Sequence, residues 1–109
     1  MTDIDPNKAV EFILQHSGRF AKAKSERVYL ENFLRSKKSL LMSQSTDQTI
    51  GGQERDAYKH PEYLALLEGL REAVEVEETL KWKLIAAQAR IDIFRTMEAS
   101  NRAQDKAAR

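Results

Sequence analysis

The chain has no cysteine and few aromatic residues. Without cysteine, its 109 residues cannot form a disulfide, a thiolate metal site or a thiol nucleophile. Aromatic residues make up 7% of the chain and charged residues 32%, a composition that disfavours a compact β-sandwich. The length allows one small domain, which we expect to span residues 1–109.

Long apolar runs are also missing. No stretch of about 18 apolar residues occurs, so the sequence predicts no membrane-spanning helix. The first residues, Met1 to Asp5, have neither the basic segment nor the apolar segment of a signal peptide. We therefore expect a soluble, cytoplasmic protein.

Motifs that carry catalysis are absent as well. The sequence contains no GxGxxG, no P-loop, no HExxH and no GxSxG. His60, Glu62 and Asp56 offer ligand atoms, but their spacing matches no known metal site. His16 beside Ser17 lacks the third group that would orient a catalytic base. We expect no enzyme, and no cofactor, metal or small-molecule substrate.

Glycine and proline are rare, and their positions predict two long helices. Asp5 followed by Pro6 is typical of a capped helix start, and we expect a helix over about 6–43. The polar segment 44–59, with Gly51 and Gly52 at its tip, predicts a connector in which 53–58 form a short helical turn. A second helix is expected over about 61–100, followed by a frayed tail, 101–109. Gly18 permits a kink or a break, but we expect the first helix to be continuous or bent there.

The second helix carries a heptad pattern typical of a coiled coil. Its a and d positions are apolar except at Glu77. The a positions are Tyr63, Leu70, Glu77, Leu84 and Ile91, and the d positions are Leu66, Ala73, Leu80, Ala87 and Phe94. The predicted fold class is all-α: a long antiparallel, coiled-coil-like helical hairpin that dimerises into a helical bundle.

An antiparallel register follows from the same pattern. Folding the first helix back so that Leu41 meets Tyr63 also pairs Leu34 with Leu70, Phe20 with Leu84 and Ile13 with Ile91. This register places Arg27 opposite Glu77. An opposite-charge pair inside an apolar row would fix the register, because slippage would leave each charge against hydrocarbon. The alternative is that both side chains simply reach water.

A second apolar stripe lies on the opposite side of the second helix. Its spacing of three and four residues predicts an oligomer or partner interface, most simply a homodimer. The stripe, here called the outer stripe, consists of Trp82, Ile85, Ala89, Ile93 and Met97. The alternative is a three-helix monomer, in which a break near Gly18 lets the N-terminal segment pack across the outer stripe.

Charge is unevenly distributed although the net charge is only +1. Residues 16–45 carry seven basic residues against two acidic ones, residues 53–79 carry three against eight, and residues 80–109 carry seven against three. We expect Glu68, Glu72 and Glu75 to neutralise Arg35, Lys37 and Lys38 across the hairpin.

The C-terminal basic block has weaker compensation and is a possible nucleic-acid contact. Its alternative role is a solvated face that improves solubility. Lys81, Arg95 and Arg102 lie on one edge of the second helix, and Lys83 and Arg90 lie on the other.

Several segments resemble a family of small helical proteins encoded by tailed bacteriophages and prophages. The similar segments are Lys24 to Glu31, Lys37 to Met42, His60 to Tyr63, Leu67 to Val74, Trp82, and Ala86 to Ile91. The resemblance covers most of residues 20–102 and implies a bacterial host cell. It also implies a setting among phage genes for DNA replication and recombination, and it brings no site residues with it.

Three functions follow as hypotheses. The first is a non-enzymatic, dimeric interaction protein that acts as a phage accessory factor in DNA recombination or replication. The second is an inhibitor of a host nuclease or defence complex, with the acidic segment Glu68 to Glu78 presenting a DNA-like row of charge. The third is a structural component of the virion or of its assembly.

Overall fold

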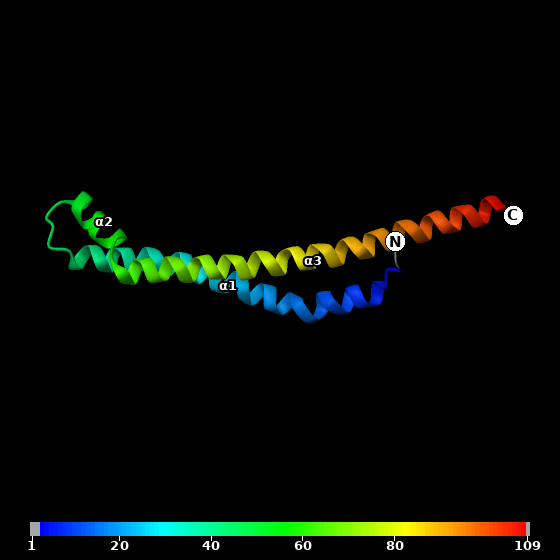
Figure 1. Cartoon of the computed structure of the whole chain (residues 1–109), viewed down its shortest axis with the longest axis horizontal. Helices are drawn as coiled ribbons and strands as arrows, with labels where there is room; N and C mark the ends of the chain where they lie inside the picture. The colour runs from blue at the N-terminus through cyan, green and yellow to red at the C-terminus, as the bar shows by residue number, and fades with distance from the viewer. Residues whose placement is uncertain (1–2, 109) are drawn as a thin grey trace. The chain divides into compact units, whose positions relative to one another are not determined.

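The computed structural model describes residues 3–108 and contains three helices over that range, with no strand (Figure 1). Helix α1 spans Pro6–Gln44, α2 spans Ile50–Tyr58 and α3 spans Pro61–Ala108. The predicted all-α helical hairpin is confirmed. The contacts divide the chain into a terminal unit, Met1–Phe20 with Thr79–Arg109, and a central unit, Ala21–Glu78.

Helix α1 begins where the sequence predicts. Asp5 Oδ1 accepts hydrogen bonds from the backbone N–H groups of Asn7 (2.9 Å) and Lys8 (3.3 Å), so it satisfies donors that the first turn leaves free. Pro6 then occupies the first helical position, where its missing N–H costs nothing. The helix continues through Gly18, so the expectation of a continuous helix is confirmed and the break required by the three-helix alternative is absent.

The heptad positions of α3 are the residues that the fold buries. Each of the predicted a and d residues is buried or half-buried, whereas every other residue from 62 to 100 except Gly69 is exposed. On α1, Ala9, Ala23 and Leu41 are buried, and Phe20 and Leu34 are half-buried. The period of the apolar residues therefore predicts the buried side of both long helices correctly.

Two ion pairs fix the direction of the helices in the central unit. Arg27 of α1 pairs with Glu77 of α3, and Lys37 pairs with Glu62 at 2.9 Å. Residue numbers rise on one helix as they fall on the other, so the helices run antiparallel. The Arg27–Glu77 pair confirms the predicted register, in which these two residues lie opposite each other.

The Arg27–Glu77 pair is enclosed by the two helices. Glu77 is 7% exposed, and the Arg27 guanidinium donates to both of its carboxylate oxygens, from Nε to one and from Nη2 to the other (3.1 Å). Nη1 of Arg27 donates to Glu31 at 2.9 Å. Hydrogen bonds to Glu77 and then to Glu31 raise the pKa of Arg27 above its usual value. The alternative, in which both side chains simply reach water, is wrong.

The connector is more ordered than the sequence indicates. Gly51 and Gly52 lie in the first turn of α2 and do not form the tip of a flexible loop. Thr49 caps this helix, because its Oγ1 accepts a hydrogen bond from the Gly52 N–H at 3.0 Å. The predicted helical turn over 53–58 is thus part of a nine-residue helix.

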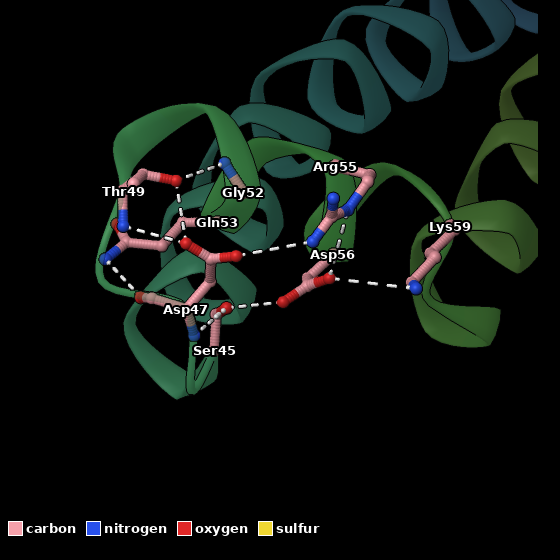
Figure 2. A network of polar contacts seen from close by, with 8 residues as sticks. All are labelled: Ser45, Asp47, Thr49, Gly52, Gln53, Arg55, Asp56 and Lys59. Atoms are coloured by element: carbon pink, nitrogen blue, oxygen red, sulfur yellow. Dashed lines mark hydrogen bonds and ion pairs between the residues drawn. The ribbon is translucent and has the colours of Figure 1, made fainter.

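A network of polar contacts around Asp47 holds the start of α2 (Figure 2). The Asp47 carboxylate accepts hydrogen bonds from the Thr49 hydroxyl (2.7 Å) and backbone N–H (2.8 Å), and from Arg55 (3.3 Å). Those contacts, with the Thr49 hydroxyl first, lower the pKa of Asp47. Ser45 Oγ donates to Asp56 at 2.5 Å, which joins the end of α1 to α2.

Helix α2 also contacts both long helices of the central unit. The Lys38 ammonium lies 4.7 Å from the centre of the Tyr58 ring and 3.6 Å from a Glu54 oxygen. The Tyr58 and Tyr63 rings meet edge to face, with centroids 5.3 Å apart. The expected neutralisation of Lys37 and Lys38 by Glu68, Glu72 and Glu75 is wrong, because Lys37 pairs with Glu62 and Lys38 with Glu54.

The end of α3 differs from the expectation. The helix continues to Ala108, past the predicted end near residue 100. Residues 99–108 are all exposed, and they contain alanine, arginine, glutamine and lysine, which are good helix formers. Across the described residues, no helix has the length and apolar character needed to cross a bilayer.

Candidate interaction surface

The outer stripe is exposed along α3 of the terminal unit. Trp82 is 61% exposed, Ile85 43%, Ile93 42% and Met97 46%, and Ala89 is exposed between them. The opposite side of the same helix segment is packed through Leu84, Ala87 and Ile91. A helix that is apolar on two sides has buried only one of them here.

The N-terminal segment of α1 does not cover the outer stripe. Val10 is 44% exposed and Leu14 is 73% exposed, whereas Ala9 and Ile13 face the interior of the hairpin. Since α1 runs unbroken through Gly18, the three-helix monomer is wrong. The outer stripe remains open to solvent in the single chain.

Cations line both edges of the outer stripe. Lys81 and Arg95 are exposed on one edge, and Lys83 and Arg90 are exposed on the other. Arg102 continues the first edge beyond the stripe. These are the residues that the sequence proposes for contact with nucleic acid, and the structure keeps all five accessible.

Two of the edge cations have defined local contacts. Arg95 Nη2 donates to Asp92 Oδ1 at 2.8 Å, and Gln88 donates to the same oxygen at 3.1 Å. The Lys81 ammonium lies 5.9 Å from the centre of the Trp82 ring, within the range of a cation–π interaction. Asp92 is the only acidic residue from 79 to 97, and Glu78 and Glu98 stand directly on either side of that range, so the cations of the first edge have acidic neighbours along the helix.

A groove of about 600 Å³ adjoins the outer stripe within the terminal unit. Its apolar lining comes from Ala9 and Phe12 of α1 and from Ala86 and Ala87 of α3. Its charged lining consists of the cations Lys8, Lys83 and Arg90 and the carboxylates Asp3 and Asp5. Sequence analysis missed this groove. The antiparallel register could have predicted it, because this register brings Phe12 near Lys83 and Arg90 on the same side of the hairpin.

The acidic segment of α3 lies in the central unit. Glu68, Glu72, Glu75 and Glu78 are exposed, and Glu77 is buried against Arg27. Arg71 lies 3.4 Å from Glu68 and offsets part of this charge. The structure therefore keeps an acidic row on the surface, as the inhibitor hypothesis requires.

Metal ligands are not clustered in the part of the chain that the structure describes. No group of three or more His, Asp or Glu side chains converges there. His60 Nδ1 accepts a hydrogen bond from the Glu62 backbone N–H at 3.1 Å, which is a local contact at the start of α3.

Comparison of the chain with protein-family models, with curated proteins and with solved structures finds no match.

Proposed function

We propose that the protein is a non-enzymatic helical interaction protein, whose outer stripe binds another macromolecule. The observation that carries this proposal is the exposure of Trp82, Ile85, Ile93 and Met97 along one side of α3. When a helix buries one apolar side and leaves a second one exposed, the exposed side typically forms an interface with another molecule. Aromatic residues and methionine are also enriched at protein interfaces.

The resemblance to phage-encoded proteins supports a narrower proposal. On that reading, the partner belongs to the machinery of DNA recombination or replication in the bacterial cell, and the hairpin is an accessory to it. The basic edges of the outer stripe favour a partner that carries negative charge. A homodimer through the outer stripe is the competing arrangement.

The second candidate function is inhibition of a host nuclease or defence complex. The exposed row Glu68, Glu72 and Glu75 favours it, because such a row can imitate the regular charge of a nucleic acid. A tight complex that survives nuclease treatment and is lost on changing these glutamates to glutamine would support this function over the first.

The test uses capture from bacterial lysate, with and without nuclease, by the tagged wild type and by two variants. Ile85→Asp/Ile93→Asp places charge on the outer stripe, and Leu14→Asp/Leu40→Asp is a matched control at apolar positions that are 73% and 55% exposed. We expect specific partners to be lost with the first variant and kept with the second. Equal capture by all three proteins would contradict the proposal.

Light scattering on the same proteins tests self-association. A dimeric mass that becomes monomeric only with Ile85→Asp/Ile93→Asp would identify the partner as a second copy. Partners that disappear on nuclease treatment would instead show that nucleic acid mediates capture, and Lys81, Lys83, Arg90, Arg95 and Arg102 would be the residues to change.

A further inference from the structure

We propose that the groove of the terminal unit binds a small organic anion that carries one negative charge on an apolar body, such as a long-chain or aromatic carboxylate. The groove has a volume of about 600 Å³, which is within the range of small-molecule sites in proteins. This inference goes beyond the proposed function, because it assigns a ligand to a surface beside the outer stripe. The ligand is bound without being changed chemically.

The floor of the groove is formed by alanines where the two helices pack. Ala9 of α1 and Ala87 of α3 are each 6% exposed, and both line the groove. Elsewhere along the buried side of α3 the corresponding positions hold larger residues, such as Leu84 and Ile91. The small side chains of the two alanines therefore leave a hollow between the helices.

Phe12 forms an aromatic wall whose orientation is already fixed. Its ring stacks on the His16 ring, with centroids 4.0 Å apart, and His16 Nδ1 donates to the Phe12 carbonyl oxygen at 2.9 Å. Both residues are half-buried. A preformed aromatic wall beside an alanine floor favours a ligand with an apolar body, because binding then requires little reorganisation of the protein.

Three cations line the groove without an ion pair of their own. Within residues 3–108, the side chains of Lys8, Lys83 and Arg90 form no ion pair and no hydrogen bond. On α3, no acidic residue lies one turn before or after Lys83 or Arg90. These cations differ in this respect from Arg95, which is paired with Asp92. They are therefore available to an anion in the groove.

The carboxylates of the groove limit the charge of the ligand. Asp3 and Asp5 line it together with the three cations, so a net charge of +1 remains. Asp5 Oδ1 is held by the two backbone N–H groups that cap α1. A ligand with one negative charge matches this balance, whereas a polyanion such as nucleic acid would bring further negative charge against Asp3 and Asp5.

Fluorescence titration with anilinonaphthalene sulfonate tests the proposal, because this probe joins an aromatic body to one sulfonate. Phenylnaphthylamine has the same aromatic body without the charge and serves as the matched probe. Each probe is titrated into the wild type, into Lys83→Gln/Arg90→Gln and into the control Lys22→Gln/Lys24→Gln, which removes two exposed cations of the central unit. Circular dichroism confirms that each variant is folded.

We expect the sulfonate to bind the wild type and the control about tenfold more tightly than it binds Lys83→Gln/Arg90→Gln, because that variant removes charge-assisted contacts with the anion. The uncharged probe should bind all three proteins alike, which shows that the apolar part of the groove is intact. Unchanged affinity of the sulfonate for Lys83→Gln/Arg90→Gln would overturn the inference.

Two alanines distinguish the groove from the outer stripe. Ala86→Leu places a larger side chain in the groove, whereas Ala89→Leu makes the same change on the outer stripe and leaves the groove open. We expect only Ala86→Leu to weaken binding of the sulfonate. Loss of binding in Ile85→Gln/Ile93→Gln, with no loss in Ala86→Leu, would place the probe on the outer stripe and contradict the proposal.

Competition shows which ligand chemistry the groove accepts. Decanoate and naphthoate should displace the sulfonate, whereas acetate, which lacks the apolar body, and decanol, which lacks the charge, should not do so at the same concentration. The stronger of the two carboxylates shows whether the groove takes a chain or a ring. If neither carboxylate displaces the probe, the groove binds the dye alone and the inference is wrong. The proposed function would then still stand, because capture from lysate tests the outer stripe separately.

Discussion

Arg27 of α1 binds Glu77 of α3 through two guanidinium nitrogens, at the point where the apolar row between the helices is interrupted. The pair occupies a core position on both helices, and Glu77 is 7% exposed. One heptad nearer the connector, Leu34 and Leu70 line one pocket together, as the same register requires. A charge pair in such a position selects one alignment of the helices over its neighbours.

Removing one partner of this pair should destabilise the protein more than removing both. In Arg27→Leu the buried Glu77 carboxylate loses its cation, whereas Arg27→Leu/Glu77→Leu replaces the pair with apolar contact. Urea denaturation should rank the free energy of unfolding as lowest for Arg27→Leu and higher for the double variant. A double variant less stable than Arg27→Leu would contradict this account of the pair.

The double variant should also lose register specificity. The chain has no cysteine, so introduced pairs report alignment directly. With Arg27 and Glu77 present, the variant Leu34→Cys/Leu70→Cys should form a disulfide, because these positions face each other in the native register. The variant Leu34→Cys/Tyr63→Cys should not, because its cysteines meet only if the helices slip by one heptad. In the Arg27→Leu/Glu77→Leu background we expect both pairs to form a disulfide, and exclusive formation of the first would show that other contacts set the register.

The two neighbouring glycines should respond differently to substitution by alanine. A Cβ at Gly52 would overlap the Asp47 carboxylate, which is held by Thr49 and Arg55, but a Cβ at Gly51 would meet open space. Gly52→Ala should therefore cost about 1–3 kcal/mol through overpacking. Gly51→Ala should stabilise the protein by about 0.5–1 kcal/mol, because α2 gains a better helix former. Thermal denaturation that shows equal effects would contradict the geometry around Asp47.

Acid should weaken the connector through Asp47. Its pKa lies below the ordinary value of 3.8, so its ionised form is favoured by folding. The stabilisation is present above about pH 4 and is lost as pH falls through the lowered pKa. Asp47→Asn should have a lower melting temperature than the wild type at pH 7 and a smaller decline between pH 5 and pH 2. Asp105→Asn, at an exposed site near the end of α3, is the control and should follow the wild-type curve.

Adjacent leucines at the end of α1 provide a matched test of the core. Leu41 is 3% exposed and Leu40 is 55% exposed. Leu41→Ala should cost about 2–5 kcal/mol in the free energy of unfolding, since it leaves a cavity under α2 and α3. Leu40→Ala should change that energy by about 0.5 kcal/mol or less. Similar losses for the two variants would indicate that Leu40 is buried in solution, for example by a partner.

The sequence predicts the long helices well because one physical signal governs them. Apolar residues at a and d positions recur over several heptads, and a helix buried on one side needs that period. Arg27 and Glu77 add a second constraint, so the register also follows. The outer stripe is correctly predicted to be apolar and exposed, because its residues fall on the side opposite Leu84 and Ile91.

Other features depend on contacts that a periodic pattern does not contain. Gly51 and Gly52 are typical of a loop, yet Thr49 and Asp47 provide the cap and the polar contacts that start a helix there. Lys37 and Lys38 have long side chains, and the fold decides which glutamates they reach: Glu62 at the start of α3 for Lys37 and Glu54 of α2 for Lys38. Predicting the groove beside Ala86 would require the orientation of the N-terminal turns of α1 against α3. The identity of a partner depends on a molecule outside the chain.

The core composition has a consequence for how the protein opens. Most of the buried apolar residues are alanines, at positions 9, 23, 57 and 87, and among residues 3–108 no large side chain is less than 2% exposed. Alanine loses no rotamer freedom on burial, but it also removes little surface from water. The apolar contacts along the two long helices are therefore small at each step. Such a structure should unfold locally from the ends of its helices. Protection of backbone amides against hydrogen exchange should therefore change gradually along each helix, without a single cooperative unfolding event.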